Sequence, residues 1–144
     1  MYIKLFTLVV LLISTGGCAS LWDAPKNIIG ISTRDLESAR KDSTYQVYQA
    51  GFSDVFNAVI EESEKAKYYV FIKDEIRGLI TVMNITGVVN TTEVGVFLTP
   101  LSRGRAVKVE LSSRSTPAKR IVAALLFSKL GERFKKTALG IETP

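Results

Sequence analysis

The first eighteen residues constrain the fold more than any other part of this sequence. Lys4 precedes a nearly unbroken apolar run, Leu5–Ile13, and small residues then lead to Cys18, the only cysteine in the chain. A short cationic start, an apolar segment of this length and a small-residue cleavage site are typical of an export signal. The run is about half as long as the ~20 apolar residues that a membrane-spanning helix needs. We therefore expect residues 1–17 to be a signal peptide that is removed.

The residues beside the expected cleavage site give a more specific indication. Thr15, Gly16 and Gly17 precede Cys18, and this segment resembles the lipobox of bacterial lipoproteins. In that family the chain is cut just before the cysteine, the thiol receives a diacylglycerol, and the new amino terminus is usually acylated. The family prefers Leu where Thr15 stands, a departure that concerns the efficiency of processing. Two alternatives remain: an ordinary secretory signal that leaves a free thiol, and an uncut leader that acts as a short anchor.

The resemblance also implies a location and a mode of attachment. One acyl chain holds a protein on a membrane only marginally, whereas two or more hold it stably, so a lipidated Cys18 would attach the domain permanently. No other cofactor is expected. In many Gram-negative bacteria an Asp directly after the lipidated cysteine retains the protein at the inner membrane. Ala19 occupies that position here, which implies the outer membrane, facing the periplasm, with the inner membrane as the alternative.

A lipidated Cys18 would leave the mature chain without a thiol, so the fold must be stable without disulfides. The 127 residues from Cys18 to Pro144 are the length of one domain with a hydrophobic core. Because large apolar residues are few between residues 19 and 44, we expect residues 18–44 to be the lipidated cysteine and a tether. The domain is expected at 45–138, followed by a tail at 139–144.

The sequence contains no histidine, and this absence excludes several kinds of site. It removes the commonest general base and the commonest metal ligand, and histidine-activated serine or cysteine nucleophiles cannot form. A zinc site would need all its ligands from Asp and Glu, which is unusual. We therefore predict no enzyme activity and no metal site. A cation site could be read from Glu61, Glu62 and Glu64, but a solvated helix face explains them more simply. A catalytic pair could be read from Asp74 and Glu75, but a turn explains them more simply.

Charge is unevenly distributed along the chain. Residues 18–100 contain 8 Lys and Arg against 11 Asp and Glu, whereas residues 101–140 contain 10 against 2. Arg114, Lys119 and Arg120 flank the start of a predicted helix, where free backbone N–H groups favour an anion. Candidate ligands are a phospholipid, lipopolysaccharide or a cell-wall polymer; nucleic acid is not expected for an exported protein, and small-molecule binding is left open. The alternative, which we favour, is that these cations are solvated surface residues that bind no ligand.

Periodicity predicts the elements of the domain, because alternation of apolar and polar residues indicates strands and apolar residues three and four apart indicate helices. Strands are expected at 45–50, 68–73, 79–85, 93–98 and 105–112, and helices at 53–67 and 118–137, with a shorter helix at 33–41. Short loops join consecutive strands, which favours antiparallel pairing. The expected fold class is α+β: an antiparallel sheet of four to five strands with two helices on one face, in the order β-α-β-β-β-β-α, a helix-grip-like sandwich.

The pattern also predicts burial and helix ends. Lys108 and Glu110 of the last strand are expected on a polar, wet sheet face opposite the helices, while the valines beside them face the helices. Residues 121–127 are apolar on all sides of the second long helix, so this part is expected to be largely buried. Ser53 and Thr116 are the expected capping residues of the two long helices.

Several stretches of the domain suggest a family likeness. They are Tyr69–Asp74 running into Arg77–Ile80, Thr91–Val96 and Val109–Ser113. Together with the element order between about residues 45 and 134, they resemble small periplasmic lipoproteins, including the repeated domain of BamC-like lipoproteins of the outer-membrane β-barrel assembly machine. The resemblance implies a membrane-anchored envelope lipoprotein with a non-enzymatic, protein-binding or structural role in the periplasm and an envelope protein as partner. A binder of an anionic envelope ligand is the alternative.

Overall fold

The computed structural model describes residues 32–136. The chain divides into two compact units, and the second, which starts at Thr33, contains nearly all the described residues. The signal peptide, Cys18 and the predicted tail at 139–144 lie outside the described residues, so the predictions about them remain predictions.

The described unit is built on one antiparallel sheet with the strand order β2-β3-β4-β5-β1-β6. The strands are β1 (Thr44–Gln49), β2 (Tyr69–Asp74), β3 (Leu79–Met83), β4 (Val94–Leu101), β5 (Ala106–Ser112) and β6 (Lys135–Lys136). The predicted α+β class and antiparallel sheet are confirmed. The two-residue strand β6, which pairs with the end of β1, was not predicted.

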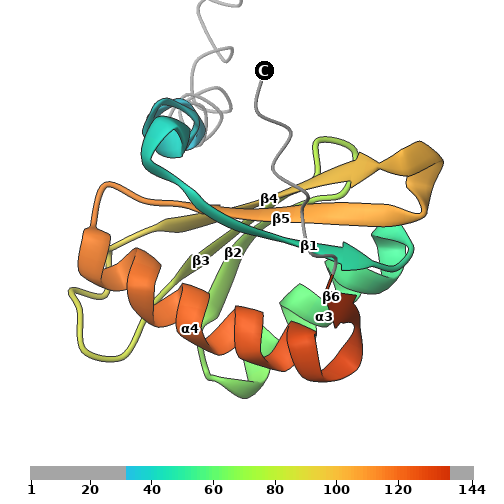
Figure 1. Ribbon diagram of the computed structural model, residues 1–144. Coiled ribbons are helices and arrows are strands. Elements are labelled where there is room, and N and C mark those ends of the chain that lie inside the picture. The colour runs from blue at the N-terminus through green and yellow to red at the C-terminus, as the bar shows by residue number, and fades with distance from the viewer. Residues whose placement is uncertain (1–31, 137–144) are drawn as a thin grey trace, which may run out of the picture. The chain divides into compact units, whose positions relative to one another are not determined.

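Two long helices, α3 (Phe52–Lys65) and α4 (Thr116–Arg133), lie on the same side of the sheet, which we call the inner face (Figure 1). Twenty buried residues from both helices and from the strands form one cluster between these two layers. On β5 the residues Val107, Val109 and Leu111 belong to this cluster, as their alternation predicted. Burial of this continuous apolar layer is the main stabilising contribution to the fold.

Both predicted helix caps were misplaced. The chain enters α3 at Gly51, and the Ser53 hydroxyl donates instead to a Glu75 carboxylate oxygen. Ser115, one residue before the predicted Thr116, caps α4, because its hydroxyl oxygen accepts a hydrogen bond from the backbone N–H of Ala118. Helix α4 also ends earlier than predicted, since the backbone becomes extended at Phe134 and continues into β6.

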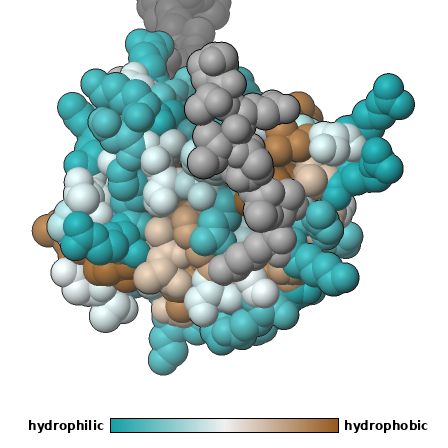
Figure 2. Space-filling model, viewed as in Figure 1, coloured by the Kyte–Doolittle hydropathy of each residue, from teal (hydrophilic) through white to brown (hydrophobic). Residues whose placement is uncertain are grey.

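The middle of α4 is less buried than its composition predicted. Val122, Ala123 and Leu126 are buried, but Ala124 is exposed and Leu125 is only half-buried. Figure 2 shows the resulting apolar surface over α4, among hydrophilic residues. A helix that covers one sheet face buries one side only, and a run of apolar residues longer than one turn necessarily places some of them outside.

A segment before β1 covers part of the opposite, outer face of the sheet (Figure 1). Residues 32–38 are helical, as predicted, and the one-turn 3-10 helix η1 (Ala39–Asp42) follows. Leu36 packs against Leu79 of β3 and Phe97 of β4 in a second, separate cluster. We call residues 33–43 the strap. These residues were expected to belong to the tether, but they fold as part of the compact unit.

The outer face is therefore not the polar, wet face that we predicted. Glu110 is only 5% exposed, and Lys108 is partly buried beside it. All five residues from Val94 to Leu98 are buried, so β4 is covered on both faces. Alternation correctly predicted which way Lys108 and Glu110 point, but the cover on that face comes from a distant part of the chain.

Candidate functional site

The three cations predicted as an anion site lie near the start of α4, but two of them already have partners. Arg114 Nη1 is 3.1 Å from Asp35 Oδ2 of the strap, and Lys119 Nζ donates to the backbone carbonyl of Asp42. Arg120 is exposed and makes no hydrogen bond or ion pair within residues 32–136. An anionic ligand at this place would compete with the strap for two of the three side chains.

Under the strap lies a buried carboxylate with four donors. Glu110 Oε1 accepts hydrogen bonds from Arg40 Nε at 3.1 Å and from the Ser43 hydroxyl at 2.8 Å. Its Oε2 accepts from Arg40 Nη2 at 2.8 Å, and Lys108 Nζ lies 2.9 Å away. The same guanidinium stacks over the Phe97 ring, 4.5 Å from its centroid. Hydrogen bonds from Arg40, then Lys108 and Ser43, outweigh desolvation and lower the pKa of Glu110 to about 2.

This arrangement determines the role of Glu110. A carboxylate whose two oxygens are both occupied by donors stays ionised at neutral pH and has no free position for a proton or a substrate. The bidentate geometry is the strong form of an Arg–carboxylate pair. Glu110 therefore fixes the strap to β5, and sequence reasoning missed it because its partner Arg40 lies 70 residues earlier.

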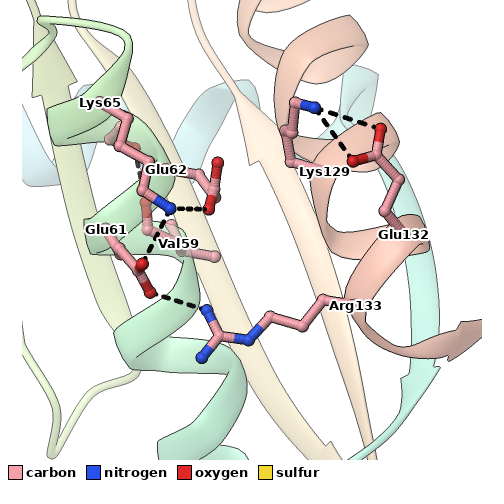
Figure 3. A network of polar contacts seen from close by, with 8 residues as sticks. Val59, Glu61, Glu62, Lys65, Lys129, Glu132 and Arg133 are labelled. Carbon is pink, nitrogen blue, oxygen red and sulfur yellow. Dashed lines mark hydrogen bonds and ion pairs between the residues drawn. The ribbon is translucent and has the colours of Figure 1, made fainter.

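A second polar network joins the two long helices on the surface (Figure 3). Lys65 Nζ lies 2.8 Å from Glu61 and 2.9 Å from Glu62 within α3, and Arg133 Nη1 of α4 lies 2.7 Å from the other oxygen of Glu61. Lys65 first, and Arg133 next, lower the pKa of Glu61 to about 2. Glu64 pairs separately with Lys73 at 2.8 Å. Each carboxylate of the predicted acidic cluster thus has a cation beside it, which agrees with the simpler interpretation as a charged helix face.

The surface between these helices is hollowed into a groove of about 450 Å³. Two acidic and two basic side chains line it, together with Ala66 and Leu125. Lys129 and Glu132, on its α4 side, form an ion pair of 3.0 Å with each other. A groove whose charges cancel and are already paired offers no selectivity for either an anion or a cation.

The two acidic residues at the hairpin between β2 and β3 make structural hydrogen bonds, Asp74 within the turn and Glu75 to α3. Asp74 Oδ1 accepts from the backbone N–H of Arg77 at 3.0 Å, and Glu75 accepts from Ser53. Gly78 has a φ of +64°, and a Cβ there would lie 2.3 Å from the backbone oxygen of Leu98. Gly78 is therefore required both by its backbone conformation and by the close approach of β4.

Neither a metal site nor a membrane span is visible in the described part of the chain. Within residues 32–136, no three His, Cys, Asp or Glu side chains come together in a group that could hold a metal ion. Across the same residues, no helix is both long enough and apolar enough to cross a membrane.

Two of the three exposed aromatic residues in the described part of the chain lie on the edge strand β2, which has a sheet neighbour on one side only among the described strands. The third, Tyr45, lies on β1, where the Lys108 ammonium is 5.6 Å from the centroid of its ring. Tyr69 is 60% exposed and Phe71 is 38% exposed, and their ring centroids are 6.4 Å apart. The register with β3 shifts between Val70 and Ile72, a β-bulge at Phe71. The sequence predicted a strand here but not an edge, because strand order depends on pairing that no local pattern reports. Exposed aromatic pairs are typical of protein-binding surfaces.

Two comparisons with known proteins give no assignment for this chain, so its function is inferred from the fold and from these surfaces. No protein-family model matches the chain, and no curated protein matches it. The class that the geometry defines is a small α+β domain with an antiparallel sheet, two helices on its inner face and a short helical strap on its outer face.

Proposed function

We propose that this protein is a membrane-anchored lipoprotein of the bacterial envelope, outer-membrane-attached and facing the periplasm, whose α+β domain binds a protein partner without catalysing a reaction. The leader at residues 1–17, which directly precedes the lone cysteine Cys18, supports the anchor. The exposed pair Tyr69–Phe71 on the edge strand supports protein binding and is the observation that carries this part of the proposal. Anchoring confines the domain to the membrane surface and raises its effective concentration there, so a weak contact suffices.

The anchor is tested by replacing its thiol. Cys18→Ala should leave the precursor uncut and free of lipid, as measured by intact-mass analysis and incorporation of labelled palmitate. Normal processing of this variant would contradict the lipoprotein assignment.

The binding surface is tested with a photo-crosslinking amino acid at position 71, in cells, followed by mass spectrometry of the captured protein. The matched control carries the same amino acid at Asn57, an exposed position of α3. We expect one specific adduct from position 71 and none from position 57. Equal capture from both positions would exclude the β2 edge as the binding surface.

A second candidate function, binding of an anionic envelope ligand, rests on Arg120, which is exposed near the start of α4. The wild-type chain should bind vesicles of anionic phospholipid, and this binding should persist in about 0.5 M salt. The variant Arg114→Ala/Arg120→Ala should no longer bind them. Binding that disappears in salt, or that the variant retains, indicates non-specific attraction by the basic surface and removes this candidate.

A further inference from the structure

Beneath the strap, the outer sheet face presents features shaped for a helix. Gly95 leaves a notch, because an added Cβ would lie 3.2 Å from Leu36 Cδ1 and 2.9 Å from the Phe97 ring. Leu36 fills this notch and is 3% exposed. Beside it, the buried Ser112 hydroxyl donates to the Leu36 carbonyl at 2.6 Å, which satisfies one of the free carbonyls near the end of a helix.

Charged groups of the domain flank the notch on both sides. Arg114 pairs with Asp35, and Glu110 pairs with Arg40 through two hydrogen bonds. The strap thus meets the sheet through an acidic residue, the Leu that follows it, and an Arg four residues after that Leu. Most of the receiving groups belong to β4, β5 or the residues just after β5, and Leu79 of β3 and Lys119 of α4 add one contact each. The inner core holds these elements in place.

The strap itself contributes little to the main core. Thr33 and Leu36 are its only buried residues, and η1 has none. Its apolar cluster of Leu36, Leu79 and Phe97 is separate from the twenty-residue cluster on the inner face. Removal of the strap therefore leaves the packing of α3 and α4 against the sheet intact, and exposes a groove with an apolar notch, a hydroxyl donor and two opposite charges.

We propose that this groove is a docking site for a helix of a partner protein, carrying an acidic residue, a Leu directly after it and an Arg four residues after the Leu, and that the strap is its built-in occupant. The charge pattern of the groove selects this occupant, because Arg114 and Glu110 complement the acidic residue and the Arg in one orientation only. The proposal rests on the proposed protein-binding role, but it uses a different surface from the β2 edge.

The test uses a fluorescent peptide of residues 32–43, constrained by a lactam between positions 37 and 41, which are both exposed in the structure. Its binding is measured by anisotropy to the full mature chain and to the variant Leu36→Ala/Arg40→Ala, whose own strap is weakened. We expect at least ~10-fold tighter binding to the variant, because the intact strap of the wild-type chain competes intramolecularly. A peptide with the same two alanines, and a variant that also has Glu110→Gln, should both lose this binding.

Two outcomes of this experiment would overturn the proposal. One is a peptide that binds neither chain although amide exchange shows the strap of the variant released and the sheet intact. The other is a dimer of the variant that the peptide does not dissociate, which would assign the groove to a second copy of this chain.

Hydrogen exchange of the wild-type chain keeps the proposal testable if the double variant does not fold. Amides of residues 33–43 should exchange at least ~10-fold faster than those of β4 and β5, since the strap opens without global unfolding. Equal exchange in both regions would overturn the proposal. A negative crosslinking result at position 71 would contradict only the β2 surface, so the two failures can be told apart.

Discussion

The two faces of the sheet are covered in different ways. On the inner face, α3 and α4 bury a continuous layer of twenty residues. On the outer face, the strap buries a three-residue cluster and relies on the pairing of Arg40 with Glu110. The inner layer is stabilised by the burial of apolar surface, which does not require a particular partner for each side chain. The outer cover depends on a hydrogen-bonded charge pair, and breaking that pair leaves a buried charge without a partner. We therefore expect the inner face to determine most of the stability of the domain, and the outer face to be held by a few specific contacts.

The largest expected effect is on the inner face. Leu126→Ala removes a fully buried side chain of α4 and should lower the free energy of unfolding by about 3–4 kcal/mol, from lost burial and the remaining cavity. Urea titration gives the value. Ala124→Ser, an exposed position on the same helix, is the control and should change it by less than ~0.5 kcal/mol. A loss below ~1 kcal/mol for Leu126→Ala would contradict the role given to this layer.

The second largest effect is expected on the outer face at acidic pH. Because the pKa of Glu110 is lowered from 4.5 to about 2, its stabilisation is present above pH 4.5 and is lost as the pH falls toward 2. About 2–3 kcal/mol of unfolding free energy should disappear over this range, with Arg40 and Lys108 as the charges that face the carboxylate.

Glu110→Gln should flatten this part of the pH dependence, as measured by urea titrations at several pH values. Glu61→Gln is the matched control, because Glu61 has a similarly lowered pKa but is half exposed. Equal flattening in both variants would show that the buried pair has no special part in acid sensitivity.

A smaller effect, about 2 kcal/mol, is expected for Leu36→Ala in the strap. The site lies close to solvent and can collapse, so the cost should fall at the lower end of the range for buried Leu. Amide exchange should become faster in residues 33–43 and stay unchanged in β4 and α4. If the sheet amides lose the same protection, the strap and the core unfold together and the contrast between the faces is wrong.

The smallest effect should come from the surface network between the helices. Exposed ion pairs are screened by water and salt, so breaking the Glu61–Arg133 contact should leave the urea midpoint at neutral pH unchanged within error. Arg133→Gln tests this from the α4 side. A clear drop in the midpoint would mean that this network helps to hold α3 and α4 together.

Local patterns in the sequence were enough for the longer strands, the two long helices and the direction in which β5 faces the inner core. The alternating valines of β5 were correctly placed inside. Such patterns work because one face of each element meets one continuous layer.

The outer face could not be predicted in this way. Alternation tells on which face Glu110 lies, but what covers that face depends on Arg40 and Leu36, which approach from a distant part of the chain. For the candidate anion site, the sequence placed Arg114 and Lys119 near the start of α4. It did not show that both contact the strap, since a charge in a sequence does not report its partner.

The bulge at Phe71 has a consequence for molecules crowded on a surface. Edge strands that present an unbroken row of N–H and C=O groups recruit copies of themselves, and fibres grow from such rows. The shift between Val70 and Ile72 makes the β2 edge irregular, which disfavours edge-to-edge pairing of neighbouring copies along it. Its aromatic side chains remain exposed, so the same bulge separates a surface open to contact from an edge open to self-association.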